Sequence, residues 1–228
     1  MLLVLMAPAF TTIKSGADAT SAAYTVKGVL DQARTYAMAN NTYTWVGFFE
    51  EDVSTASTNP ATPGTGRIVM SIVASKDGTT VYDPNSLAKI DTTKLIQVGK
   101  LIKIENVHLA TFTDAPTGTG STFATRPNVT STYRIGNTTP SNSRTPFQYP
   151  VGSPEPVAQY TFVKAVQFGP RGEGRIDNNT DYILQTAAEI GMVPTHSTTV
   201  ANANLNLVPN RVAVQFTGAG GDVKIYRQ

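Results

Sequence analysis

The run Asp177-Asn-Asn-Thr-Asp181 comes closest to a metal site in this sequence. Asp177, Asn179 and Asp181 place side-chain oxygens at its first, third and fifth positions, which suits the preference of calcium for oxygen ligands. An EF-hand loop would also need a glycine where Tyr182 stands and a closing glutamate where Ala188 stands. The sequence therefore favours a polar loop here, with calcium binding as the alternative.

The other groups that could do chemistry do not form a site in the sequence. His108 and His196 are the two histidines of a chain without cysteine, and neither lies at ligand spacing from a second ligand, which disfavours zinc. Glu50, Glu51 and Asp52 form an acidic cluster that we interpret as a solvated strand end.

No G-x-S-x-G element is present, and the glycine-rich run Gly169–Arg175 lacks the spacing of a phosphate-binding loop. We predict no catalytic residue and no cofactor. Sequence cannot show a pair assembled from distant strands, so a hydrolase stays the lowest-ranked alternative.

Composition narrows the classes of function. The chain has 228 residues and a net charge of +2, only 15% of its residues are charged, and the basic residues are scattered. We therefore predict no nucleic-acid partner. The absence of cysteine excludes disulfides and thiol chemistry but leaves the compartment open. Abundant Ser, Thr, Asn, Gly and Pro are typical of an exported surface protein.

The chain begins with an apolar stretch, Met1–Phe10, and carries no charged residue before Lys14. This stretch is shorter than the ~20 residues that a membrane-spanning helix needs. Three interpretations stay open: the end of a longer hydrophobic helix, a secretory signal cleaved at Ala7-Pro8-Ala9, or a first helical turn buried in the protein's own core.

The segment that follows, up to about Asn41, has the period of an amphipathic helix. Its apolar residues recur at intervals of three and four, so they share one face. The Asn40-Asn41 pair predicts the end of the helix, because asparagine tolerates the left-handed backbone conformation. The positions expected to pack against a sheet are Val26, Val29, Leu30, Ala33 and Ala37.

The remainder, residues 42–228, is expected to be a β-rich body that follows a helical spine over residues 1–41. Segments 42–49 and 67–74 predict a hairpin with a long loop, and segments 211–216 and 223–227 predict a second one. Further strands are expected at 100–112 and 160–168, whereas 182–193 fits either a short helix or a strand. Residues 113–159, rich in Pro, Thr and Ser, are expected to form a surface insertion.

The order of these elements resembles that of type IV pilins and type II secretion pseudopilins, most closely the H-type, FimT-like group. The helix end matches an ARxxAxxxN pattern through Ala33, Arg34, Ala37 and Asn41, and Phe168-Gly-Pro-Arg-Gly172 looks like an F-x-P-x-G element. Segments 189–196 and 212–227 resemble the last strands of that group. Such proteins begin with a basic leader, a cleavage point and a hydrophobic helix with an early glutamate. None of these is present here, so the chain looks like one that starts part-way along that helix.

The resemblance implies an α+β fold in which a long N-terminal helix packs on an antiparallel sheet, with a β-rich body towards the C-terminus. It implies a non-enzymatic structural subunit of a pilus or pseudopilus filament, whose partners are copies of itself or other pilin-like subunits. The inner membrane would hold it before assembly, and the cell envelope or an extracellular filament afterwards. The residues expected to mediate assembly are Leu2, Leu3, Val4, Leu5, Met6, Pro8 and Phe10. The alternative is a secreted β-sandwich binding or adhesin module with a cleaved signal.

Overall fold

The computed structural model describes the backbone of residues 3–80, 91–138, 142–143, 146–152, 158–176 and 184–228, and the surroundings of side chains from Asp18 onward. Within these residues there is one α-helix, α1 (Leu3–Ala39). It ends where the sequence predicts: Asn41 has a φ of 49°, and the Thr42 N–H donates to the carbonyl of Ala37 at 2.9 Å. This left-handed turn satisfies a carbonyl that the helix end would leave unpaired.

The rest of the described chain consists of short strands and 3₁₀ turns. The strands of the first half are β1 (Thr44–Asp52), β2 (Gly66–Ser75), β3 (Leu95–Gln97), β4 (Ile102–Glu105), β5 (Val107–Leu109) and β6 (Arg134–Ile135). Those of the second half are β7 (Phe147–Tyr149), β8 (Tyr160–Phe162), β9 (Lys164–Phe168), β10 (Gly174–Ile176), β11 (Ala188–His196), β12 (Thr199–Val200), β13 (Val212–Phe216) and β14 (Val223–Arg227). The 3₁₀ turns are η1 (Thr92–Lys94), η2 (Phe123–Thr125), η3 (Ser131–Tyr133) and η5 (Leu205–Leu207).

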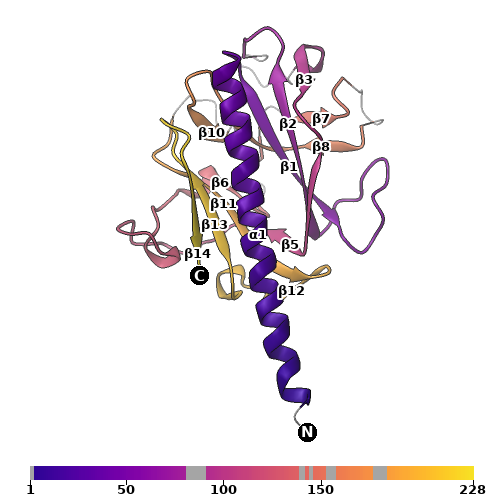
Figure 1. Cartoon of the computed structure of the whole chain (residues 1–228), viewed down its shortest axis with the longest axis vertical. Helices are drawn as coiled ribbons and strands as arrows, with labels where there is room; N and C mark the ends of the chain where they lie inside the picture. Colours follow the sequence, from indigo (N-terminus) through magenta and orange to yellow (C-terminus); the bar gives the residue numbers. More distant parts are fainter. Residues whose placement is uncertain (1–2, 81–90, 139–141, 144–145, 153–157, 177–183) are drawn as a thin grey trace.

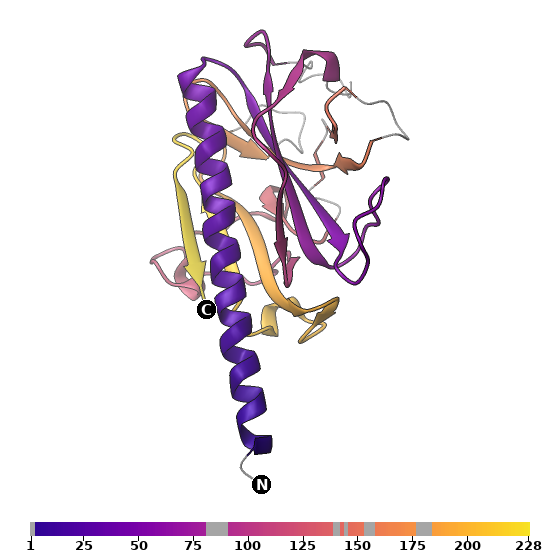
Figure 2. The same ribbon diagram turned by 45° about the vertical axis from the view of Figure 1, so that its right-hand side comes forward.

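These strands form three sheets (Figures 1 and 2). The first sheet has the order β10-β9-β1-β2-β3, with β4 also paired to β2. The second has the order β12-β11-β13-β14, with β5 and β6 also paired to β11. The third is the pair β7-β8. All described strand pairs are antiparallel except β6 with β11.

The two predicted hairpins are confirmed. Strand β1 pairs with β2 across the loop, and β13 pairs with β14. The ambiguous segment 182–193 contributes β11, which is a central strand of the second sheet and not a helix. The strand expected over 100–112 is divided at Asn106, whose φ is 62°. Its first part, β4, joins the first sheet, and its second part, β5, joins the second sheet, so this segment links the two.

The α+β fold class expected from the sequence is wrong. The structure is mostly β, arranged in three sheets, and it is not a long helix packed on a single sheet. Helix α1 supplies 37 of the 228 residues. One helix of this size cannot cover the apolar faces of two six-stranded sheets, so further strands and loops must provide the other layers.

The burial of β2 shows why more layers are needed. Ile68, Met70 and Ile72 face the main core together with α1, whereas Val69 and Val73 face a second cluster that includes Trp45, Phe147 and Phe162. The β7-β8 pair supplies this second cover. It approaches so closely that a Cβ atom at Gly47 of β1 would lie 2.5 Å from the Cβ of Phe162, so only glycine fits there.

The Pro-, Thr- and Ser-rich segment 113–159 contributes buried residues as well as exposed ones. Phe123 and Val129 are 4% exposed, and Ile135 is fully buried in β6. Phe123 packs in a third apolar cluster on the second sheet, with Phe112, Ala213 and Tyr226 among its members. The described part of this segment therefore covers the face of the second sheet that α1 leaves open.

Candidate functional site

The N-terminal part of α1 extends beyond the sheets in both views, whereas its C-terminal part lies against the body (Figures 1 and 2). Ala19 is the first residue of α1 in the core among those whose side chains are described. We call the helix over residues 3–18 the extension, and its length is roughly 24 Å at 1.5 Å per residue. Of the residues expected to mediate assembly, Leu2 lies outside the described part of the chain, and the others belong to the extension: Leu3, Val4, Leu5, Met6, Pro8 and Phe10.

The first part of the extension, Leu3–Phe10, is apolar in sequence but limited in length. No charged residue occurs before Lys14. A search of the described residues finds no helix with both the length and the hydropathy to span a bilayer.

The C-terminal part of α1 packs against the β-rich body. The five positions expected to contact a sheet are at most 3% exposed and belong to the main core: Val26, Val29, Leu30, Ala33 and Ala37. This core contains residues of both six-stranded sheets, for example Phe48 of β1 and Ile190 of β11. The Thr44 hydroxyl donates to the carbonyl of Ala33 at 3.0 Å, and Lys27 Nζ donates to the carbonyl of Val223 at 3.1 Å. These contacts attach the described part of α1 to both sheets.

The calcium candidate Asp177, Asn179 and Asp181 lies outside the described residues. Among the residues that are described, no three His, Cys, Asp or Glu side chains gather in a way that could hold a metal ion.

Glu51, from the predicted acidic cluster, is not solvated but 1% exposed. Its carboxylate accepts hydrogen bonds from Ser57 Oγ at 3.0 Å and from Arg67 Nη1 at 3.1 Å, and it lies 3.5 Å from Lys103 Nζ. Burial alone would raise the pKa of Glu51, but the hydrogen bonds from Ser57 and Arg67 and the two cations together lower the pKa. The solvated strand end expected from the sequence is thus wrong for this residue.

This cluster brings together a serine, a lysine and a tyrosine. Lys103 Nζ lies 2.5 Å from Ser57 Oγ and 2.7 Å from the Tyr160 hydroxyl. A lysine activates a serine only when its amine has a free lone pair to accept the proton. Lys103 Nζ instead donates to both hydroxyls, and it lies 3.5 Å from the Glu51 carboxylate and 5.3 Å from the centroid of the Tyr160 ring. The arrangement therefore fits a clamp that ties the β1–β2 loop to β4 and β8, and not a nucleophilic site.

The two histidines have different surroundings. His108 Nδ1 of β5 lies 2.6 Å from Glu50 Oε1 of β1, so this pair connects the two six-stranded sheets. His196 is exposed at the end of β11. Near the first pair, Lys164 of β9 donates to the carbonyls of Gly136 and Thr138. Burial lowers the pKa of Lys164 to about 8, against the opposing effect of the Glu50 carboxylate.

Sequence reasoning missed a deeply buried ionic cluster. Arg126 is fully buried and donates to both carboxylate oxygens of Asp114 at 2.7 Å and to Glu189 Oε2 at 2.7 Å. Its guanidinium lies 4.0 Å from the ring centroid of Phe123. Glu189 also accepts from Gln215 Nε2 at 2.8 Å. No sequence signal could have found this cluster, because its members come from an irregular segment and two strands that are far apart in the chain.

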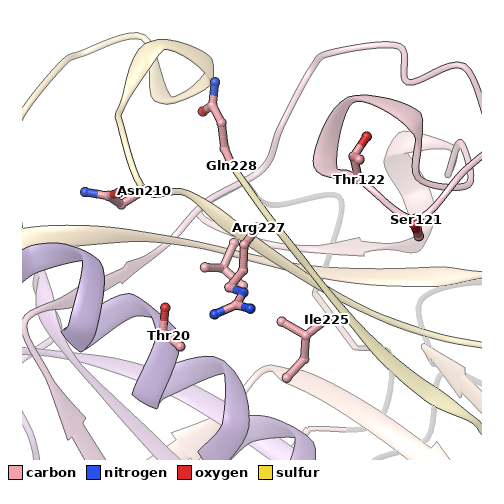
Figure 3. A pocket seen from close by; sticks show the side chains of 8 residues that line it. Thr20, Ser121, Thr122, Asn210, Ile225, Arg227 and Gln228 are labelled. Atoms are coloured by element: carbon pink, nitrogen blue, oxygen red, sulfur yellow. The ribbon is translucent and has the colours of Figure 1, made fainter.

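Strand β14 is the outermost strand of the second sheet (Figures 1 and 2). Two neighbouring cavities form a groove beside it. One cavity, of about 480 Å³, is lined by Thr20 of α1, Ser121 and Thr122 of the insertion, and Ile225, Arg227 and Gln228. Figure 3 shows Thr20 on one side of β14 and Ser121 and Thr122 on the other. A neighbouring cavity of about 730 Å³ continues along Lys224 and Tyr226.

No family model matches the chain, and neither the curated proteins nor the solved structures give a match. The resemblance to pilins and pseudopilins therefore stays a prediction from sequence motifs.

Proposed function

We propose that this protein is a structural subunit of a type IV pilus-like or type II secretion pseudopilus filament, which assembles through the N-terminal extension of α1. The observation that carries the proposal is the extension itself. The apolar residues Leu3–Phe10 lie on a helix that runs beyond the sheets, whereas residues from Ala19 onward are anchored in the core. The β-rich fold lends this proposal no support, because it differs from the expected class.

The energetics favour an assembly role for the extension. Isolated helices of this length are marginal in water without tertiary packing, so an apolar helix that runs beyond its own body would be stabilised by burial against another molecule. Burying each Leu or Met side chain against neighbouring subunits would contribute about 1.5–3 kcal/mol. Several such side chains on each subunit would sum over every interface of a repeating assembly.

The partners on this proposal are copies of this chain or related subunits, and the inner membrane is the location before assembly. The firm attachment of α1 to both sheets supports this role, since a filament transmits tension from subunit to subunit through its core. An enzymatic role is not proposed, because the Ser57–Lys103–Tyr160 cluster fits a clamp.

The decisive experiment compares two pairs of Leu→Asp substitutions. Leu3→Asp with Leu5→Asp places charge on the extension, and Leu184→Asp with Leu207→Asp places the same charge on two exposed positions of the body, which are 40% and 64% exposed. We expect the first pair to abolish filaments in electron micrographs of sheared surface material, with an unchanged thermal melt of the body. The second pair should leave filaments intact.

Two outcomes would contradict the proposal. Filaments that persist in the Leu3→Asp, Leu5→Asp variant would exclude the extension as the assembly element, and equal loss in both pairs would show a general effect of added charge. A mature N-terminus near Phe10, measured by intact mass on protein from its own cells, would instead favour the secreted binding module.

A further inference from the structure

The backbone hydrogen bonds of β14 show which of its groups are free. The Gln228 N–H donates to the Arg211 carbonyl at 3.1 Å, and the Thr217 N–H donates to the Asp222 carbonyl at 3.1 Å. Hydrogen-bonded and non-bonded pairs alternate along an antiparallel ladder. Given the register of β13 and β14, Lys224 and Tyr226 bond to β13, whereas Val223, Ile225 and Arg227 direct their N–H and C=O groups to the outer edge.

This outer edge is partly used at one end and open at the other. The Val223 carbonyl accepts from Lys27 Nζ of α1 at 3.1 Å. No backbone hydrogen bond from a described residue outside the β13 ladder reaches Ile225 or Arg227. An unpaired row of this kind is a template on which another extended chain can pair.

The surroundings of the edge form a channel and not a flat surface. Helix α1 with Thr20 forms one wall, and the insertion, with Ser121 and Thr122, forms the other (Figure 3). Gly118 and Gly120 place little side-chain bulk beside Lys224 and Tyr226. Walls on both faces suit a single extended segment, because a second copy of β14 would bring its own helix and insertion into the same space.

The charge of the edge indicates which segment fits. Lys224 and Arg227 are exposed, and neither forms an ion pair with a described residue. They project to opposite faces, since side chains alternate along a strand. Lys224 lies on the face of Tyr226, which packs in the third apolar cluster, and Arg227 lies on the face of Ile225, which packs against the main core beside α1.

We propose that the β14 edge binds an extended segment of a partner protein that carries two carboxylates three positions apart. The segment pairs its backbone with Ile225 and Arg227 and continues the second sheet. The spacing follows from the geometry, because the residues opposite Lys224 and Arg227 are three apart and face opposite sides of the sheet. This inference does not depend on the proposed filament function.

The probe is the capped peptide Thr-Glu-Val-Thr-Glu-Val-Thr, and the control is Thr-Glu-Val-Glu-Thr-Val-Thr, which has the same composition but places both carboxylates on one face. Binding to the full chain is followed by NMR titration up to about millimolar concentration, a range that detects the weak affinities of short peptides. We expect the probe to bind more tightly than the control by up to about fivefold, the contribution of one exposed ion pair. We also expect the amides of Ile225 and Arg227 to become protected from hydrogen exchange, with those of Lys224 and Tyr226 already protected.

Methylation of the peptide tests the backbone pairing without altering the protein. Alternate amides of a paired strand face β14, so N-methylation of one set should weaken binding by about tenfold or more, and methylation of the other set should not. Lys224→Glu should remove the preference for the probe, whereas Lys100→Glu, an exposed lysine just before β4 in the first sheet, should preserve it.

Three results would overturn the proposal. Absence of binding at millimolar probe would show that Lys224 and Arg227 only protect the edge against pairing. Binding that is indifferent to which amides are methylated would show a charge contact without strand pairing. Concentration-dependent dimerisation that protects Ile225 and Arg227 would assign the edge to a second copy of the chain.

Discussion

Arg126 Nε and Glu189 Oε2 meet at 2.7 Å with both side chains at most 1% exposed, and this contact fixes the insertion on strand β11. We expect Arg126→Met to lower the free energy of unfolding by about 3–5 kcal/mol, because the buried Glu189 and the partly exposed Asp114 would each lose a charged partner. Urea denaturation followed by circular dichroism measures this change. The matched control is Arg171→Met, whose side chain is 87% exposed and which should change stability by less than about 0.5 kcal/mol.

If Arg126→Met proves nearly neutral, the insertion is not held by this cluster. The free energy of unfolding of the double variant Arg126→Met with Glu189→Leu would then separate two effects. One is the net contribution of the ion pair to stability, and the other is the cost of leaving the Glu189 charge buried without a partner.

The packing of α1 gives a second prediction. Leu30 is fully buried in the main core, and Met38 of the same helix is 47% exposed. We expect Leu30→Ala to cost about 2–5 kcal/mol through lost transfer energy and the cavity left behind. Met38→Ala should cost less than about 1 kcal/mol, since little surface is buried there. Similar losses for both variants, measured by thermal and urea unfolding, would show that the helix does not pack on the sheets through its Leu30 face.

These examples show which parts of the structure the sequence could predict. Local patterns identified α1, its end at Asn41 and the hairpins β1–β2 and β13–β14, because each depends on residues that are near in the chain. The sheet to which each strand belongs depends on distant partners. The segment around Asn106 serves two sheets, and nothing in its alternation distinguishes that from one strand with a bulge.

In the candidate sites, too, the sequence identifies single residues but not the distant residues that surround them. The sequence singled out Glu51 as one of three adjacent acids, but its burial depends on Arg67, Lys103 and Tyr160, which reach it from β2, β4 and β8. Likewise, the groove beside β14 depends on the position of Ser121 relative to a strand about 100 residues later. Ionic clusters and grooves of this kind have no sequence period, so only the fold reveals them.

Acid unfolding tests the Glu51 cluster. The pKa of Glu51 is lowered in the folded protein, so its contribution to stability is complete above the unfolded pKa of about 4.3 and is lost as pH falls through the folded pKa. We expect Glu51→Gln to be less stable than the wild type at neutral pH, and the difference to narrow below about pH 4. Urea midpoints measured across this range check the sign. A difference that stays constant with pH would mean that the Glu51 charge makes no contribution.

The Lys164 ammonium gives a prediction of the same sign at alkaline pH. Burial lowers the pKa of Lys164 to about 8, whereas an unfolded lysine titrates near 10.4. Between these values the unfolded chain binds more protons than the folded one, so this residue makes stability rise with pH over that window and adds no slope well below it. We expect the wild type to gain stability relative to Lys164→Met as pH is raised from about 7.5 to about 10. Free energies of unfolding from urea titrations of both proteins supply the comparison. A parallel pH dependence would show that Lys164 keeps its ordinary pKa and that its contacts to Gly136 and Thr138 do not bury the charge.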